Sequence, residues 1–163
     1  LAEAGYPNGL ELSLKLPPVD NYARKGGQIV ASQLEKAGFK IKIENVDWPK
    51  WLDEVYKNKN YDLSIVSHVE PMDINIYANP NYYFGYDNED FQKIIAEAEK
   101  ATDPMVVSAL YRDAQRKIAE DAVNGYLFQL GKYGVWKKEV RGLWRSYPIR
   151  SNDLRDVFIE GND

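Results

Sequence analysis

The segment 34–73 constrains the fold more than any other part of the sequence. It contains a helical run that ends at Gly38, an alternating strand over 40–46, a second helix and an apolar strand over 61–69. Gly38 suits the left-handed position that closes a helix, and Asp47 suits the N-cap of the next one. Helices that alternate with strands in this way are typical of a parallel α/β unit. Such sheets bind ligands at the carboxyl ends of their strands, so the segment also indicates where a site would lie.

The flanking segments extend this pattern. The run LELSLKL over 10–16 alternates apolar and polar residues, which predicts a strand with one buried face. The short apolar centre of 61–69 favours a central parallel strand. Two helices are expected next, one with a capping-box-like start at Asp87 and one with Asp103 as its N-cap before Pro104. Two short strands are expected near the end of the chain, over 125–130 and 133–137.

Composition excludes several classes of protein. The 163 residues fit one domain, or one domain with an appendage. The net charge of −4 argues against a nucleic-acid binder, which normally carries a basic face. There is no Cys, hence neither a thiol nucleophile nor a zinc–thiolate site. The chain begins with LAEAG rather than Met, which indicates a cut through a longer protein, so a missing signal peptide carries no weight.

The residues that could support catalysis are few. The chain has one His and lacks a nucleophile elbow, a phosphate-binding loop and a dinucleotide fingerprint. A metal site made of His68, Glu70 and Asp73 is a conceivable alternative, but a single His and the absence of EF-hand spacing weigh against it. We therefore expect no cofactor, no metal and no enzymatic activity.

The polar residues His68, Glu70 and Asp73 follow the third predicted strand at its carboxyl end, where an α/β sheet leaves a crevice. Position alone supports a ligand site and a solvated loop start equally. The loop that follows is rich in aromatic residues, which suit a ligand wall because they give contact area at low entropic cost. They suit a lid over the core as well. The aromatic residues are Tyr77, Tyr82, Tyr83, Phe84 and Tyr86.

Several stretches together resemble a known family. LAEAGYPNGLELSLKLP, then LEKAGFKIKIENVDWPKWL, then YDLSIV are similar to extracellular solute-binding protein family 5, the periplasmic or lipid-anchored receptors of ABC importers for dipeptides, oligopeptides and nickel. TDPMVVSALYRDAQRKIAED and VWKKEVRGL resemble two later segments of that family. The resemblance spans nearly the whole chain. It implies an α/β fold with a mostly parallel or mixed sheet flanked by helices, as one lobe of a two-lobed, type II periplasmic-binding-protein fold.

The resemblance implies a function and an organisation. Residues 1–125 would be the ligand-binding, carboxyl-terminal lobe of the parent. Residues 126–163 would return to the missing amino-terminal lobe or pack on a partner chain. The isolated lobe is therefore expected either to dimerise through this segment or to leave it disordered. The parent would be periplasmic or extracellular, with a lipid anchor as one form. It would capture a peptide or peptide-like solute without catalysis and deliver it to an ABC permease.

The resemblance also implies a site. In peptide-binding members an acidic residue after the YD strand pairs with the peptide's amino terminus, and Glu70 and Asp73 are the candidates here. The predicted ligand-binding residues are His68, Glu70, Asp73, Tyr77, Tyr82 and Tyr83. Two other functions remain open: a hydrolase that uses His68 with Glu70 or Asp73, and an interaction module whose acidic body and basic tail drive assembly.

Overall fold

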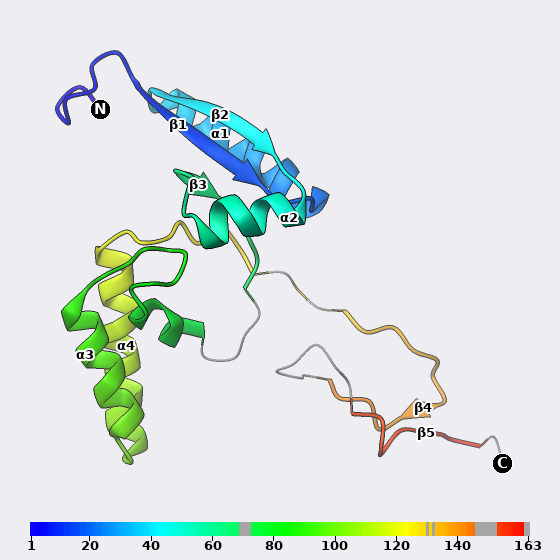
Figure 1. Ribbon diagram of the computed structural model, residues 1–163. Helices are drawn as coiled ribbons and strands as arrows, with labels where there is room; N and C mark the ends of the chain where they lie inside the picture. The colour runs from blue at the N-terminus through cyan, green and yellow to red at the C-terminus, as the bar shows by residue number, and fades with distance from the viewer. Residues whose placement is uncertain (69–72, 130, 132, 146–152, 162–163) are drawn as a thin grey trace.

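The computed structural model describes residues 1–68, 73–129, 131, 133–145 and 153–161. It contains a parallel sheet covered by helices, a separate pair of helices, and an extended carboxyl-terminal segment (Figure 1). We call residues 1–124 the body and residues 125–161 the tail. None of the helices in the described part of the chain is long and apolar enough to cross a membrane.

The sheet has three parallel strands, β1 (Leu10–Leu16), β2 (Phe39–Asn45) and β3 (Leu63–Ser64). Their order is β2-β1-β3, so β1 lies in the centre. β1 and β2 pair along their whole length, from Leu10 opposite Phe39 to Leu16 opposite Asn45. The first two predicted strands are therefore confirmed to within one residue.

The third strand differs from its prediction. A central strand over 61–69 was expected, but of the residues described there only Leu63 and Ser64 pair, and they lie at an edge of the sheet. Asp62 anchors this short strand. Its Oδ2 accepts hydrogen bonds of 2.7 Å from the backbone N–H and the hydroxyl of Ser13 in β1. A short apolar strand can lie partly buried at the edge of a sheet as well as fully buried in its centre. The prediction was wrong because the apolar run alone does not distinguish these positions.

One face of the sheet is covered by α1 (Lys25–Lys36), which follows a single π-type turn, η1 (Asp20–Arg24), and lies behind β1 and β2 in Figure 1. Because side chains alternate along a strand, Leu14 and Leu16 of β1 point to the same face. They form a buried cluster with Ala31 of α1. This cluster is the core of the sheet layer.

Two glycines shape this layer. Gly27 of α1 lies directly over Leu16, and a Cβ at this position would come within 2.4 Å of the Leu16 Cδ1 atom. The helix approaches the sheet this closely because Gly27 has no side chain. Gly38 follows α1 with a φ of +94°, the left-handed conformation that the sequence predicts for the end of the helix.

The opposite face is covered by α2 (Trp48–Trp51), which continues into a π-type segment, η2 (Leu52–Lys57). The Asp47 carboxylate accepts a hydrogen bond of 2.8 Å from the Lys50 N–H, so the predicted N-cap is confirmed.

An ion pair with a buried lysine joins this helix to the sheet. Lys15 of β1 is only 5% exposed, and its Nζ lies 2.7 Å from the Glu54 carboxylate in η2. The hydrogen bond from Lys15 lowers the pKa of the Glu54 carboxyl. The pair satisfies a charge that would otherwise be costly to bury.

The helical part of the body consists of η3 (Asp73–Ala78), α3 (Glu89–Lys100) and α4 (Pro104–Glu120). α3 and α4 lie side by side and apart from the sheet (Figure 1). Residues spaced along one face of each helix form the buried centre of this part, which contains Tyr77, Phe91, Ile95, Ala114 and Ile118.

The two predicted helix starts have different outcomes. α4 begins as expected, because the Asp103 carboxylate accepts a hydrogen bond of 2.8 Å from the Met105 N–H. The prediction for α3 was wrong by one residue. Its N-cap is Asn88, whose side-chain oxygen accepts from the N–H groups of Asp90 and Phe91, both at 3.0 Å. Asp and Asn are equally good N-caps, so adjacent candidates cannot be separated by residue type.

The tail has little regular structure. The strands predicted over 125–130 and 133–137 are absent from the described residues of those ranges. Instead, β4 (Val140–Arg141) pairs antiparallel with β5 (Phe158–Ile159). A strand needs a partner for its backbone hydrogen bonds, and sequence alternation cannot supply one. No described residue beyond Ile118 is buried, and the tail runs away from the body in Figure 1.

Candidate functional site

Three of the predicted site residues meet at the carboxyl end of the β3 segment. The Nε2 atom of His68 and the hydroxyl of Tyr83 form a hydrogen bond of 2.8 Å, in which the donor depends on the imidazole tautomer. On the other side of the ring, Nδ1 of His68 lies 3.9 Å from the Asp73 carboxylate. His68 therefore lies between an acidic and a phenolic group.

These residues belong to a larger aromatic cluster, which we define as His68, Tyr82, Tyr83 and Phe84. The ring centroids of Tyr82 and Tyr83 are 5.0 Å apart, and those of Tyr83 and Phe84 are 4.4 Å apart. The imidazole of His68 lies 5.5 Å from the ring of Phe84. Tyr82 is half-exposed and Tyr83 is only 6% exposed. The cluster combines apolar ring faces with polar tips, a composition that suits recognition of an organic ligand.

Contacts distant in the sequence hold Tyr83 in place. The hydroxyl of Tyr61 donates a hydrogen bond of 2.9 Å to the Tyr83 carbonyl oxygen. The ring of Trp51 in α2 packs edge-on against the Tyr83 ring, with centroids 5.6 Å apart. Sequence reasoning did not assign Trp51 or Tyr61 to the site. No local signal could have done so, because the Tyr61 contact spans 22 residues of chain.

Tyr77 lies elsewhere. It is 8% exposed within the helical core, and its ring stacks on Phe84 with centroids 4.4 Å apart. Its hydroxyl oxygen accepts a hydrogen bond from the Asn124 side chain. Burial raises the pKa of the Tyr77 phenol. Tyr77 thus supports the aromatic cluster from beneath, through Phe84.

The remaining candidate, Glu70, lies outside the described residues. The metal alternative depended on Glu70 together with His68 and Asp73. Among the residues that the structure does describe, no group of three or more His, Cys, Asp or Glu side chains is placed to hold a metal ion.

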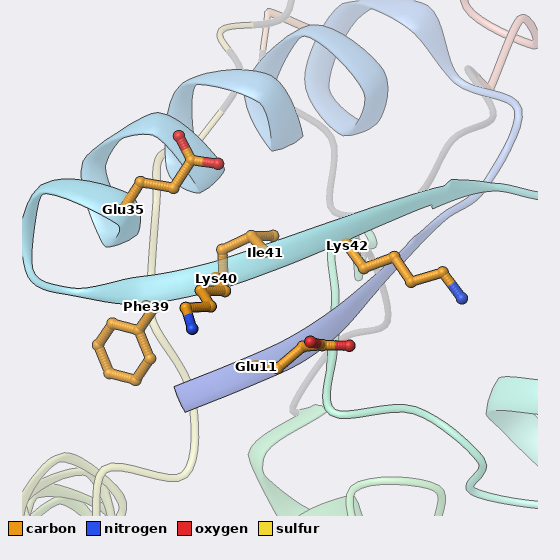
Figure 2. A pocket seen from close by; sticks show the side chains of 6 residues that line it. All are labelled: Glu11, Glu35, Phe39, Lys40, Ile41 and Lys42. Carbon is orange, nitrogen blue, oxygen red and sulfur yellow. The ribbon is translucent and has the colours of Figure 1, made fainter. Parts of the chain in front are cut away.

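An open groove of about 530 Å³ lies away from these residues, beside β2 and α1. Figure 2 shows the side chains around it, contributed by β1, α1 and β2. None of the predicted site residues lines it. Its lining consists of Glu11, Glu35, Phe39, Lys40, Ile41 and Lys42.

The first part of the chain, from the amino terminus through the aromatic cluster, matches a known family. The family model described as "Bacterial extracellular solute-binding proteins, family 5 Middle" covers residues 1–90, more than half of the chain. The chain belongs to this family. The match includes the sheet, α1, α2 and the whole aromatic cluster, so the candidate site lies within the family region.

A curated periplasmic protein is similar over most of the chain. The probable D,D-dipeptide-binding periplasmic protein DdpA of Escherichia coli (strain K12) is 29% identical over 123 residues. This match covers 68% of the chain but 23% of the relative, so the chain spans about a quarter of that protein's length.

Solved structures of binding proteins share the fold. Haemophilus influenzae OppA, in a complex with the peptide RPPGFSPFR, is 25% identical with a TM-score of 0.66, over 74% of this chain and 25% of that one. Bacillus subtilis AppA, in complex with a nonapeptide, is 19% identical with a TM-score of 0.71, over 98% of this chain and 36% of that one. The expected fold class, an α/β lobe of the type II periplasmic-binding-protein fold, is confirmed.

Proposed function

We propose that this chain forms the ligand-binding lobe of the substrate-binding component of an ABC importer. It offers one wall of a cleft to a peptide-like solute, a second lobe closes over the solute, and the closed form docks on the membrane permease. The observation that carries this proposal is the aromatic cluster with Asp73 beside its His68, within the region that matches family 5. The relatives are named as binding proteins, and we propose that this one is non-catalytic too.

The proposed ligand contacts are His68, Asp73, Tyr82 and Tyr83, with Tyr77 as support from below. The Asp73 carboxylate would pair with a peptide's ammonium group. Glu70 is the second candidate for this role. The rings of Tyr82 and Tyr83 would cover the peptide's apolar side chains.

The experiment is isothermal titration calorimetry of the full-length receptor with the peptide RPPGFSPFR and with D-alanyl-D-alanine. We expect at least one of them to bind, and Asp73→Asn and Glu70→Gln to show which carboxylate holds the ammonium group. Loss of that charge pair weakens affinity roughly tenfold or more. Asp113→Asn, the same kind of change at an exposed carboxylate of α4 away from the aromatic cluster, is the matched control. Absence of binding by any peptide in a broad panel would overturn the proposed function.

We further propose that residues 1–125 form this lobe and that 126–163 pack against the amino-terminal lobe of a periplasmic or extracellular receptor, with or without a lipid anchor. One feature of the tail supports this division. The described tail residues include several large exposed apolar side chains, among them Tyr126, Phe128 and Trp136. Apolar surface of this kind is typical of an interface.

In isolation, the chain is expected to dimerise through this tail. Light scattering of the isolated chain, with and without residues 126–163, tests the expectation. A monomer whose tail is ordered and packed on its own body would contradict it.

A further inference from the structure

A single carboxylate from α4 holds the end of the loop that carries the aromatic cluster. Asp121 directly follows α4, and its Oδ2 accepts hydrogen bonds from the Tyr86 hydroxyl at 2.6 Å and from the Asn88 side-chain amide at 2.8 Å. Its other oxygen, Oδ1, lies 3.1 Å from the Lys117 Nζ. Three donors therefore converge on one side chain.

Two of these groups, the Asp121 carboxyl and the Tyr86 phenol, have shifted pKa values that define the hydrogen bond between them. The hydrogen bond from Tyr86 is the main cause of the lowered pKa of the Asp121 carboxyl, which is therefore ionised. Burial raises the pKa of the Tyr86 phenol, which therefore keeps its proton and acts as the donor. Hydrogen bonds to an ionised acceptor are about twice as strong as neutral ones.

The hydrogen bonds of Asp121 to Tyr86 and Asn88 lie close in sequence to the proposed ligand contacts Tyr82 and Tyr83. Tyr86 follows a tight turn in which the Gly85 N–H donates a hydrogen bond of 2.9 Å to the Tyr82 carbonyl oxygen. On the preceding side, Tyr61 holds the Tyr83 carbonyl. The stretch that presents Tyr82 and Tyr83 is thus held by Tyr61, which lies just before β3, and by Asp121, which lies just after α4.

We propose that Asp121 is a positioning residue for ligand binding, which fixes the Tyr82 and Tyr83 rings by holding Tyr86 and Asn88. This inference rests on the proposed function, because it assumes that those rings form part of the ligand wall. Asp121 itself does not touch the ligand. It ties the helical part of the body to the site region.

The first test measures the loop without any ligand, by amide hydrogen exchange of the chain. The reporters are the amides of Tyr82 and Gly85, which donate to the carbonyls of Asn79 and Tyr82. We expect Asp121→Ala to accelerate their exchange roughly tenfold or more, the effect of losing a charge-assisted anchor. Asp113→Ala is the control, since Asp113 lies in α4, the helix that Asp121 follows, and pairs with Arg116 at 3.0 Å. Unchanged exchange in Asp121→Ala would overturn the inference.

The second test measures binding of RPPGFSPFR and D-alanyl-D-alanine to the full-length receptor. Asp121→Ala should weaken the bound peptide's affinity roughly tenfold, and Asp113→Ala should leave it unchanged. Tyr86→Phe removes the hydroxyl but keeps the ring, so it gives the same direction of effect even if Asp121→Ala does not fold.

The two tests separate the possible failures. Faster loop exchange with unchanged affinity would overturn the positioning role while leaving the proposed function intact. A wild-type receptor that binds no peptide would overturn the proposed function, and the exchange data would still decide whether Asp121 holds the loop.

Discussion

The body and the tail contain the same kinds of aromatic residue with opposite outcomes. Phe91 in the body is fully buried between α3 and α4, whereas Phe158 in the tail is 58% exposed. Trp51 packs beneath the aromatic cluster, whereas Trp136 lies on the surface. The difference teaches that apolar content alone does not make a core. A segment also needs a second element with a complementary face, which the body supplies through its helices and the tail does not.

The largest expected difference between body and tail is in the effect of replacing a phenylalanine by alanine in each. Phe91→Ala should lower the free energy of unfolding by about 3–5 kcal/mol, because it leaves a cavity in the helical core. Phe158→Ala should change it by less than about 0.5 kcal/mol, as for an exposed site. Urea denaturation followed by circular dichroism measures both. A comparable loss from both variants would show that the tail is packed in solution.

A second pair sharpens the description of the body. Gly27→Ala should lower the free energy of unfolding by about 1–3 kcal/mol, because the new methyl group collides with the fully buried Leu16. Gly26→Ala, one residue earlier with open space around it, should stabilise by about 0.5–1 kcal/mol. Thermal unfolding distinguishes the two signs. Stabilisation by both changes would mean that α1 does not sit as close to β1 as described.

A third pair tests where α3 begins, after the loop that carries Tyr82, Tyr83 and Tyr86. Asn88→Ala should cost at least about 1 kcal/mol of stability, because it removes the N-cap and also the hydrogen bond to Asp121. Asp87→Ala removes only an exposed hydrogen bond to Gln92 and should cost less than about 0.5 kcal/mol. Chemical denaturation of the two variants gives the comparison. A larger loss of stability in Asp87→Ala than in Asn88→Ala would show that Asp87 is the N-cap instead.

The smallest expected effect is a difference in acid sensitivity between body and tail. The backbone N–H of Ser13, followed by its hydroxyl, lowers the pKa of the Asp62 carboxyl. A carboxyl with a lowered pKa stabilises the fold above its unfolded pKa, and this contribution is lost as the pH falls through the folded pKa. The urea concentration at the unfolding midpoint should therefore decrease as the pH is lowered below about 4. In Asp62→Asn this decrease should be smaller.

Asp153 in the tail provides the control for this measurement. The side chain of Arg155 lowers the pKa of the Asp153 carboxyl. The two residues are only two positions apart, so their contact stabilises a local turn, whereas the Asp62 contact joins two strands 49 residues apart. Asp153→Asn should leave the acid branch of the stability curve unchanged. An equal effect from both variants would mean that the β1–β3 contact contributes no more than a surface turn.

Much of the fold could be predicted because its signals are local. The alternation in β1 and β2, the left-handed Gly38 and the caps at Asp47 and Asp103 each depend on a few adjacent residues. The edge position of β3 could not be predicted. It depends on which strands pair, a property of residues distant in the chain.

The site shows the same division. The sequence pointed to the end of the third strand and to the tyrosine loop, and His68, Asp73 and Tyr83 do lie together there. Whether Tyr77 faces the site or the core depends on how η3 packs against α3 and α4, which no local pattern encodes. The anchors on the loop are equally non-local, since Asp121 lies 35 residues from Tyr86.

The Lys15–Glu54 pair has a consequence for how this sequence can change over time. Glu54 alone is difficult to replace, because Lys15, which is only 5% exposed, would be left charged and without this partner. Lys15 alone is easier to replace, because Glu54 is partly exposed and also pairs with Lys50 at 3.6 Å. Both together can be exchanged for apolar residues of similar volume at little cost. Among descendants of this chain, a lineage that has lost Glu54 should therefore have lost the charge of Lys15 as well, whereas loss of Lys15 alone is tolerated more easily.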